Sequence, residues 1–249
     1  MAIFWALANF VQATFTLVWS AFWISLALLV RLVTGSNRLP LHMAHRFWAP
    51  GLLWRCVMKI DVQGTEKVDF SRPHIFAANH QSLLDVAVLY AMLPVPLLFV
   101  LKRELSRVPF LGWYVTAMGM ILVDRNRRRR SLEALEECRQ RLSSGHSILL
   151  FPEGTRSRDG SIGHFKPGIF APVIETGVDI VPVMLDGPGK VLPPGGFRIR
   201  PGVIRVRLGR PVPTASYTVE DRRALADRVW QEVVELRRQV DEAQEPTAA

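Results

Sequence analysis

The chain has 249 residues, of which 49% are hydrophobic and 21% are charged, and its formal net charge is +9. This composition is typical of a globular protein, and the length fits one large domain or one domain with an appendage. The two cysteines form neither a disulfide framework nor the paired spacing of a metal site, and the six histidines are scattered, so we expect no metal and a reduced, cytoplasmic setting.

Charge is distributed unevenly along the chain. Residues 1–30 contain no charged residue, whereas residues 31–60 contain five basic residues and no acidic one. As a helix, thirty residues would extend about 45 Å, against roughly 30 Å of hydrocarbon in a bilayer. Nothing basic precedes the apolar run, so a signal peptide does not fit. We expect a membrane-embedded anchor, spanning or re-entrant, in preference to an ordinary buried helix.

Residues 39–60 mix apolar and basic residues around Pro40 and Pro50. This composition predicts a helix at the membrane interface, where basic side chains meet anionic head groups. A solvated basic helix packed on the domain is the alternative. We assign residues 1–56 to an N-terminal membrane-anchoring helical region. If its first segment spans, the basic flank puts the rest of the chain in the cytoplasm, on the inner side of the plasma membrane.

From about residue 57 short apolar runs alternate with helical periodicity, which predicts an α/β fold with a mostly buried central β-sheet flanked by helices. Residues 57–215 would form this core, and residues 216–249 a C-terminal helix and tail. The predicted strands are 57–62, 74–78, 97–102, 120–124, 147–151, 179–185 and 203–208. The predicted helices are 81–92, 128–143, 168–176 and 219–240. Residues 186–202, rich in Pro and Gly, are expected to form a loop.

The sequence Asn-His-Gln-Ser-Leu-Leu-Asp, residues 79–85, follows a predicted strand and opens a helical pattern. Histidine has a pKa suited to proton abstraction near neutrality, which makes His80 a candidate general base. A carboxylate such as Asp85 can fix the tautomer and stabilise the imidazolium. Five residues along an ideal helix rotate about 140°, so this contact requires His80 at the helix start. Free N–H groups there could also bind an anion or oxyanion.

Two further segments come at strand ends. Phe-Pro-Glu-Gly-Thr-Arg-Ser, residues 151–157, puts Glu153 and Arg156 in one short turn, and arginine can hold a phosphate with two hydrogen bonds. Lys-Arg-Glu-Leu, residues 102–105, places Lys102 after a strand as a second phosphate contact. Taken singly, the first segment is expected to be a surface turn with a solvated ion pair, and the second a solvated strand end.

Taken together, these segments resemble the 1-acyl-glycerol-3-phosphate acyltransferases within the wider glycerolipid acyltransferase group. Residues 79–85 match the Asn-His-x-x-x-x-Asp block of that family, residues 102–112 resemble its second block, and residues 151–157 match its third. Residues 165–168 (Phe-Lys-Pro-Gly) also fit, and residues 180–183 resemble the fourth block, a strand with a central proline. The matches are in family order from Asn79 to Val183.

The resemblance implies an acyltransferase that needs no cofactor. His80 would take the proton from the free sn-2 hydroxyl of lysophosphatidate, and Asp85 would orient His80. The hydroxyl oxygen would attack an acyl thioester of coenzyme A or acyl-carrier protein directly, giving phosphatidate for phospholipid synthesis at the membrane. The residues implied in binding the acceptor are Glu153, Gly154, Thr155, Arg156, Lys102 and Lys166.

The sequence leaves three alternatives open. The run from Arg125 to Arg130 could bind nucleic acid, but no aromatic residues are interleaved with it, which favours lipid head groups or a solvated face. The second alternative, an inactive membrane lipid-binding protein, is disfavoured by the intact His80, Asp85 and Glu153. The third is an enzyme with another lysolipid acceptor, such as a lyso-ornithine lipid, which lacks the phosphate.

Overall fold

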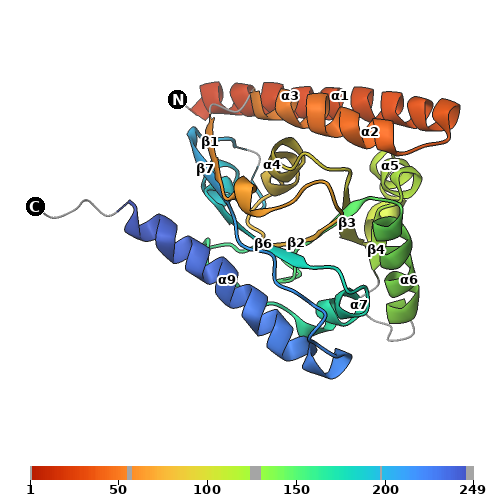
Figure 1. Cartoon of the computed structure of the whole chain (residues 1–249). Helices are drawn as coiled ribbons and strands as arrows, with labels where there is room; N and C mark the ends of the chain where they lie inside the picture. The colour runs from red at the N-terminus through yellow and green to blue at the C-terminus, as the bar shows by residue number, and fades with distance from the viewer. Residues whose placement is uncertain (1, 55–57, 124–129, 197, 245–249) are drawn as a thin grey trace, which may run out of the picture.

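The computed structural model describes residues 2–54, 58–123, 130–196 and 198–244 (Figure 1). Its strands are β1 (Met58–Gln63), β2 (Ile75–Ala78), β3 (Leu97–Lys102), β4 (Ile121–Val123), β5 (Ser147–Leu150), β6 (Ile180–Asp186) and β7 (Gly202–Leu208). Its longer helices are α1 (Ala2–Thr34), α4 (Leu84–Met92), α5 (Leu111–Met118), α6 (Arg130–Ser143) and α9 (Arg222–Glu242). The shorter ones are α2 (Arg38–Met43), α3 (Ala49–Trp54), α7 (Phe170–Ile174) and α8 (Pro188–Val191).

The strands form one mixed sheet in the order β1-β7-β6-β2-β5-β3-β4. The five strands from β6 to β4 are mutually parallel, and β7 joins them by antiparallel pairing with β6. The seven predicted strands are thus present, each within one residue of the predicted bounds, and the α/β fold class is confirmed. Because the parallel strands share one direction, their carboxyl ends lie along one edge of the sheet.

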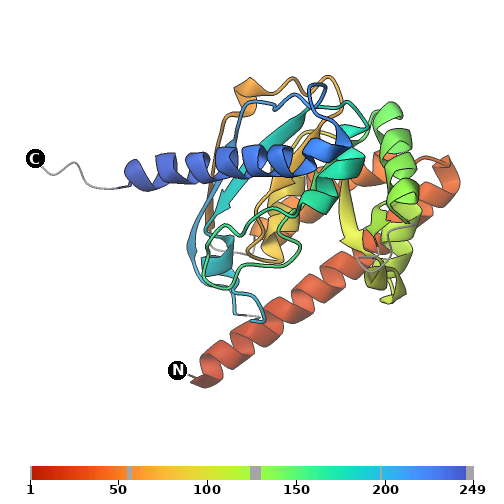
Figure 2. The same cartoon turned by 90° about the horizontal axis from the view of Figure 1, so that it is seen from below.

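Side chains of the central strands alternate between two apolar layers. In β2, Phe76 and Ala78 pack into one core cluster with α4 and the N-terminal helices, whereas Ile75 and Ala77 pack into a second cluster with α6, α7 and α9. This period of two is what a strand buried on both faces requires. The sheet is therefore covered by helices on both faces, with α9 lying along the face opposite α4 (Figures 1 and 2).

The N-terminal helices form a separate layer over α4 and α5 (Figure 1). Helix α1 contains a stretch, Leu7–Thr34, that is long and apolar enough to cross a membrane by length and composition, and Ala27 is its one buried residue. Within the segment predicted as an interfacial helix over 39–60, the described residues up to Trp54 are helical, through α2, a π-helical turn (Ala44–Trp48) and α3. Residues 58–60 instead belong to β1, so that part of the helix prediction is wrong.

Other helix predictions differ in their bounds. Helix α4 begins at Leu84 rather than at residue 81, and α5 was not predicted. The predicted loop 186–202 contains the short helix α8. The predicted helix 219–240 starts with a 3₁₀ turn, Val219–Asp221, and continues to Glu242. Residues 55–57, which include Cys56, and residues 124–129, which include most of the basic run that begins at Arg125, lie outside the described residues.

Candidate active site

The predicted site residues follow the carboxyl ends of neighbouring parallel strands. His80 comes two residues after β2, Glu153 three residues after β5, and Lys102 ends β3. Strands β2, β5 and β3 are adjacent in the sheet and parallel, so the loops that follow them meet at one edge. The carboxyl edge of an open α/β sheet is where such folds commonly bind ligands.

His80 and Asp85 are in direct contact. The Nδ1 atom of His80 lies 2.7 Å from Oδ2 of Asp85, whose side chain is fully buried, whereas the His80 side chain is 18% exposed. The same Oδ2 accepts hydrogen bonds from the backbone N–H groups of Gln81 at 2.6 Å and Ser82 at 2.9 Å. Three donors therefore hold one carboxylate oxygen in place beneath the imidazole.

This contact depends on where α4 begins. Residues 79–82 are not helical, and the chain turns back so that Asp85, in the first turn of α4, faces His80. The expectation that free N–H groups of this helix start bind an anion is not supported for the first residues. Those of Gln81 and Ser82 donate to Asp85, and that of Leu84 donates to the Ser82 hydroxyl at 3.2 Å.

The imidazole of His80 has a fixed orientation. Its ring stacks on that of Phe151, with centroids 4.0 Å apart and planes inclined by 17°. Because an ionised carboxylate only accepts hydrogen bonds, the partner of Asp85 is the protonated Nδ1, which leaves the lone pair on Nε2. No described residue forms a hydrogen bond with Nε2. The arrangement leaves that nitrogen available to accept a proton from a bound molecule.

Glu153 lies behind the histidine and joins two loops. One oxygen of its buried carboxylate accepts the backbone N–H of His80 at 2.9 Å, and the other accepts that of Gly163 at 3.3 Å. Burial raises the pKa of Glu153 to about 7, with a further contribution from the nearby Asp85 carboxylate, while the two N–H donors oppose the rise. Glu153 is thus poised to titrate near neutral pH.

The backbone of the third motif is tied to the first. The N–H of Ser157 donates to the carbonyl oxygen of His80 at 2.8 Å, so both the N–H and the C=O of His80 are held by residues 153–157. The N–H of Lys166 donates to the carbonyl of Pro152 at 3.0 Å, which brings the Phe-Lys-Pro-Gly segment beside the same turn. Segments that are 73 or more residues apart from His80 in sequence therefore define its position.

The residues implied in acceptor binding surround this edge with different exposures. Gly154 is buried and has φ of +72°, a conformation that favours glycine at the turn. Arg156 is half-buried and, within the described part of the chain, has no ion-pair partner. Thr155, Lys102 and Lys166 are exposed. The structure brings the backbone of these segments to one edge, and the assignment of their side chains to an acceptor stays a prediction.

Three buried polar residues of the first motif position it and were not predicted individually. The Asn79 side chain pairs with both backbone groups of Leu185 in β6, donating at 2.9 Å and accepting at 2.7 Å. Gln81 donates to the same carbonyl at 3.1 Å, and the Ser82 hydroxyl donates to the carbonyl of Leu192 at 2.7 Å. Their place directly beside a candidate histidine was the available signal for a positioning role. Their partners could not be predicted, because they lie more than 100 residues away in sequence.

An apolar cavity of about 240 Å³ lies between the N-terminal helices and the core. Leu83 and Val86, from the segment after His80, form part of its wall, and Trp23, Trp48 and others from the N-terminal layer form another part. Phe99 also lines it and lies 6.4 Å, between ring centroids, from Phe151, the ring that stacks on His80. Two successive aromatic rings, Phe99 and Phe151, therefore lie between the cavity and the candidate base.

Comparisons with known proteins agree with this geometry. The profile of the family described as Acyltransferase matches residues 59–186. A chloroplastic 1-acyl-sn-glycerol-3-phosphate acyltransferase of Arabidopsis thaliana is 35% identical over 69% of this chain and 48% of its own length. The alpha form of that enzyme from Homo sapiens is 32% identical over 74% of this chain and 65% of its own length. The chain thus spans about half the length of the first of these relatives.

A solved structure resembles the whole chain. The crystal structure of the 1-acyl-sn-glycerophosphate acyltransferase PlsC from Thermotoga maritima superposes with a TM-score of 0.80 at 25% identity, covering 100% of this chain and 99% of that one. The profile match runs from the second residue of β1 to the end of β6 and therefore includes both His80 and Glu153. The resemblance inferred from the motifs is confirmed at the level of the family, and the chain belongs to the acyltransferase family.

Proposed function

We propose that this protein transfers a fatty acyl group from an acyl thioester to the free sn-2 hydroxyl of lysophosphatidate, which gives phosphatidate. The observation that carries the proposal is the His80–Asp85 pair, with Nδ1 bonded at 2.7 Å to a fully buried carboxylate and Nε2 unengaged by the described residues. The names of the relatives support this substrate class, since several are 1-acyl-sn-glycerol-3-phosphate acyltransferases.

The proposed reaction needs one base and no covalent intermediate. Nε2 of His80 takes the proton of the acceptor hydroxyl while its oxygen attacks the thioester carbonyl carbon. The tetrahedral intermediate collapses with cleavage of the C–S bond, and the leaving thiolate takes the proton from the imidazolium. Asp85 stabilises that imidazolium as it forms. A positioned general base of this kind contributes roughly 10²–10⁴ to the rate.

The phosphate of the acceptor needs fixed positive charge near His80, because a dianion that enters a partly desolvated site must be paired. Arg156 is the candidate favoured by its half-burial and by its place in the turn that clamps the His80 backbone. Lys102 and Lys166 are exposed at the same edge and are weaker candidates. The donor is acyl-coenzyme A or acyl-carrier protein, both of which present the same thioester.

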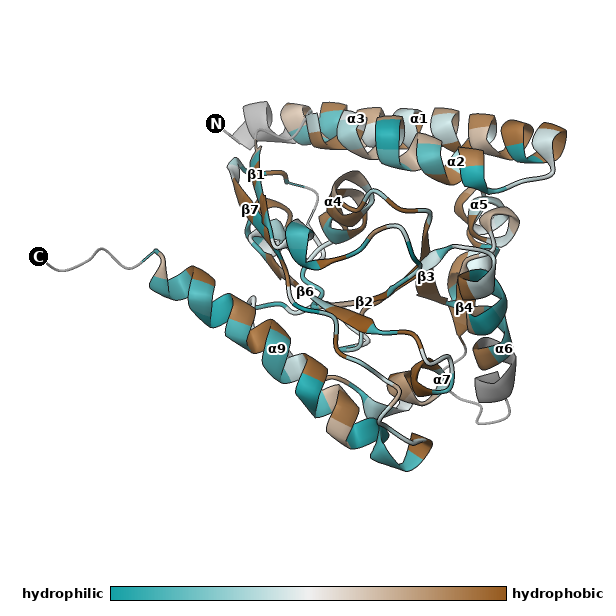
Figure 3. Cartoon of the chain, viewed as in Figure 1, coloured by the Kyte–Doolittle hydropathy of each residue, from teal (hydrophilic) through white to brown (hydrophobic). Residues whose placement is uncertain are grey.

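The N-terminal layer supports a membrane location. Along α1 the exposed apolar side chains include Phe10, Leu17 and Leu32, exposed by 69%, 71% and 81%. Figure 3 shows apolar colour recurring along α1, whereas hydrophilic and apolar colours alternate along α9. A contiguous apolar surface of this kind marks a membrane or protein contact. We assign residues 1–56 as the anchor and place the enzyme at the inner membrane with its active site on the cytoplasmic side.

The apolar cavity between this anchor and the core fits the acyl chain of a substrate. Its described lining is apolar apart from tyrosine hydroxyls and tryptophan N–H groups, and the rings of Phe99 and Phe151 separate it from His80. Each methylene moved from lipid to water costs about 0.8 kcal/mol. A cavity between the N-terminal helices and the core would therefore bind the acyl chain of a substrate with little exposure of that chain to water.

A substrate panel tests the proposal. Purified protein in detergent would be offered lysophosphatidate, lysophosphatidylcholine and lyso-ornithine lipid, each with acyl-coenzyme A and with acyl-carrier protein, and the products would be identified by mass spectrometry. We expect phosphatidate as the main product. Transfer to lyso-ornithine lipid alone would instead support the alternative acceptor without a phosphate. No transfer to any acceptor would support the inactive lipid-binding alternative.

A further inference from the structure

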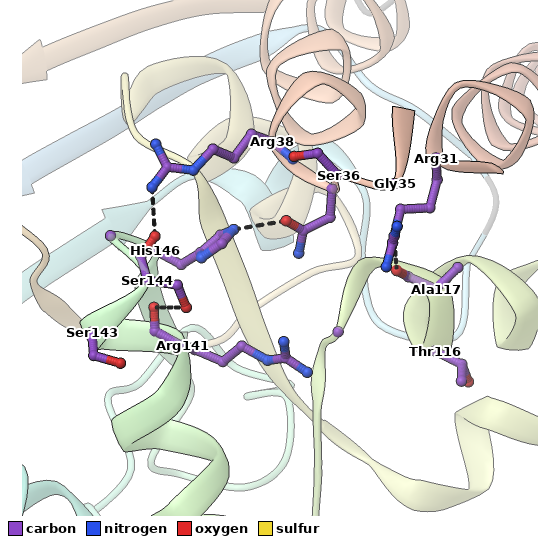
Figure 4. Close-up of a pocket in the computed structure, with 13 residues that line it drawn as sticks. Arg31, Gly35, Ser36, Arg38, Thr116, Ala117, Arg141, Ser143, Ser144 and His146 are labelled. Atoms are coloured by element: carbon purple, nitrogen blue, oxygen red, sulfur yellow. Dashed lines mark hydrogen bonds between the residues drawn. The ribbon is translucent and has the colours of Figure 1, made fainter. Parts of the chain in front are cut away.

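A polar pocket of about 700 Å³, distinct from the apolar cavity, lies where the turn between α1 and α2 meets the C-terminal ends of α5 and α6 (Figure 4). We call it the basic pocket, because Arg31, Arg38, Arg141 and His146 line it and no acidic residue does so among the described residues. Serine and threonine hydroxyls, including those of Ser36 and Thr116, complete its polar wall. None of these residues belongs to the candidate active site.

Two of the arginines form hydrogen bonds with carbonyl groups at helix C-termini. Arg31 donates from Nε to the carbonyl of Ala117 at 3.3 Å, and Arg38 donates to the carbonyl of Ser144 at 2.5 Å. Such contacts satisfy carbonyl groups that helix C-termini leave unpaired. Each helix end carries about half a negative charge, and three ends, those of α1, α5 and α6, meet at the pocket, so together they offset about one and a half of the three arginine charges. More than one positive charge therefore remains without a counterion in the described part of the pocket.

The pocket is preformed by contacts between its walls. The Asn37 amide donates to the carbonyl of Met118 at 2.6 Å, and its oxygen lies 3.0 Å from Nε2 of the buried His146. Burial, with the charges of Arg38 and Arg141 beside it, lowers the pKa of His146 below its ordinary value. Burial is the main cause of the lowered pKa, and the positive charge of the two arginines acts in the same direction.

The basic pocket is separate from the proposed acceptor site. His146 immediately precedes β5, and Phe151 and Glu153 follow the other end of that strand. The four residues of β5 span about 13 Å, so the pocket and His80 lie at opposite edges of the sheet. A lysolipid whose phosphate is bound in the pocket could not reach Nε2 of His80 with its hydroxyl, because the packed strand β5 separates the two sites.

Exposed apolar side chains flank the pocket. Leu32 and Val33, next to Arg31, are exposed by 81% and 75%, and Leu39, next to Arg38, is exposed by 49%. Basic groups beside apolar side chains at the end of a long apolar helix match the boundary between head groups and acyl chains in a bilayer. A phospholipid phosphate at that depth would meet the arginines while its chains lie against the leucines and valine.

We infer that the basic pocket binds the phosphate group of an anionic membrane phospholipid as a site distinct from the catalytic one. The inference rests on the membrane location in the proposed function, but it does not require acyl transfer. Free phosphate offers the same oxygens as a lipid head group, so the test includes both. Phosphatidylglycerol is the lipid probe, because it is neither the substrate nor the product of the proposed reaction.

The test uses full-length protein in dodecyl maltoside, with bound lipid counted by native mass spectrometry during titration with phosphatidylglycerol or phosphatidylcholine. The wild type should retain phosphatidylglycerol in preference to phosphatidylcholine. Near an anionic head group each basic side chain contributes about 1 kcal/mol, so Arg38→Gln with Arg141→Gln should weaken binding about thirtyfold. The matched pair Arg222→Gln with Arg223→Gln, exposed on α9, removes the same charge and should leave binding unchanged.

Two further variants serve as controls for an effect of the substitutions on folding. Arg141→Gln alone preserves the Arg31 and Arg38 contacts with the helix ends and should weaken binding about fivefold. Arg38→Lys with Arg141→Lys keeps the charge and should restore much of the affinity. Equal retention of the two lipids, or equal loss in the α9 pair, would overturn the inference. Displacement of the lipid by inorganic phosphate at the same concentration would also overturn the lipid assignment, in favour of a free-phosphate site.

Discussion

Replacement of Asp85 by asparagine tests how the base is held. The carboxylate is fully buried, and its Oδ2 accepts from His80 Nδ1 and from the N–H groups of Gln81 and Ser82. An amide oxygen can accept these three bonds but lacks the negative charge that stabilises an imidazolium. A hydrogen bond to a charged group is worth about 1.5–3 kcal/mol, so we expect kcat to fall roughly ten- to a hundredfold.

Stability should change for a separate reason. The second oxygen of Asp85, Oδ1, is buried without a hydrogen-bond partner among the described residues, and the asparagine NH₂ would occupy its place. An unsatisfied buried donor lowers the free energy of unfolding by about 1–3 kcal/mol. Asp227→Asn, at an exposed position on α9, is the matched control and should change neither kcat nor the free energy of unfolding.

The assay is initial-rate acyl transfer in detergent, with thermal unfolding measured on the same samples. A kcat for Asp85→Asn within twofold of the wild type would refute the reasoning, because the buried carboxylate would then contribute nothing to the base. A loss as complete as that of His80→Ala, in protein that remains folded, would show that the charge matters more than a single hydrogen bond allows.

Three other perturbations follow from the geometry. Arg156→Ala should raise KM for lysophosphatidate roughly ten- to a hundredfold and KM for the acyl donor much less. Arg156→Lys should recover part of this loss. Unchanged kinetics in Arg156→Ala would favour an acceptor without a phosphate. The folded state raises the pKa of Glu153 from 4.5 to about 7, so the stability contributed by its proton is present below about pH 4.5 and is lost as pH rises through about 7. Thermal unfolding between pH 5 and 8 should therefore show less pH dependence in Glu153→Gln, and an identical profile would contradict the raised pKa. Removal of residues 1–54 should release the protein from membranes or make it insoluble, because it removes the apolar α1 and uncovers the core beneath; a soluble and fully active fragment would contradict the anchor.

The strands were predictable because their physical signal is local. Runs such as Ile148–Leu150 and Val181–Leu185 are buried on both faces of the sheet, so nearly every residue is apolar and the run is short. The helix α5 was missed because Gly112 and Gly119 resemble turn signals. Gly112 instead permits close packing, since a Cβ there would lie 2.1 Å from the backbone oxygen of Ser106.

The site was predictable only in part. The motif identified His80 and Asp85, but periodicity alone could not place the start of α4 at Leu84, and that start determines whether the two side chains meet. The role of Glu153 in holding the His80 N–H, and of Asn79 in holding Leu185, depends on strand neighbours 73 and 106 residues away in sequence. The basic pocket was also beyond prediction, because Arg38 and Arg141 come together only where the Arg38 side chain reaches the carbonyl of Ser144, after the end of α6 and 106 residues away in sequence.

The central claim is that Nε2 of His80 accepts the proton of the lysolipid hydroxyl. The most direct measurement is phosphatidate formation from lysophosphatidate and an acyl thioester by purified His80→Ala, with products identified by mass spectrometry and folding checked by thermal unfolding. We predict a folded protein whose rate falls by roughly 10²–10⁴, the contribution of a positioned general base. Turnover close to that of the wild type in folded His80→Ala would contradict the account.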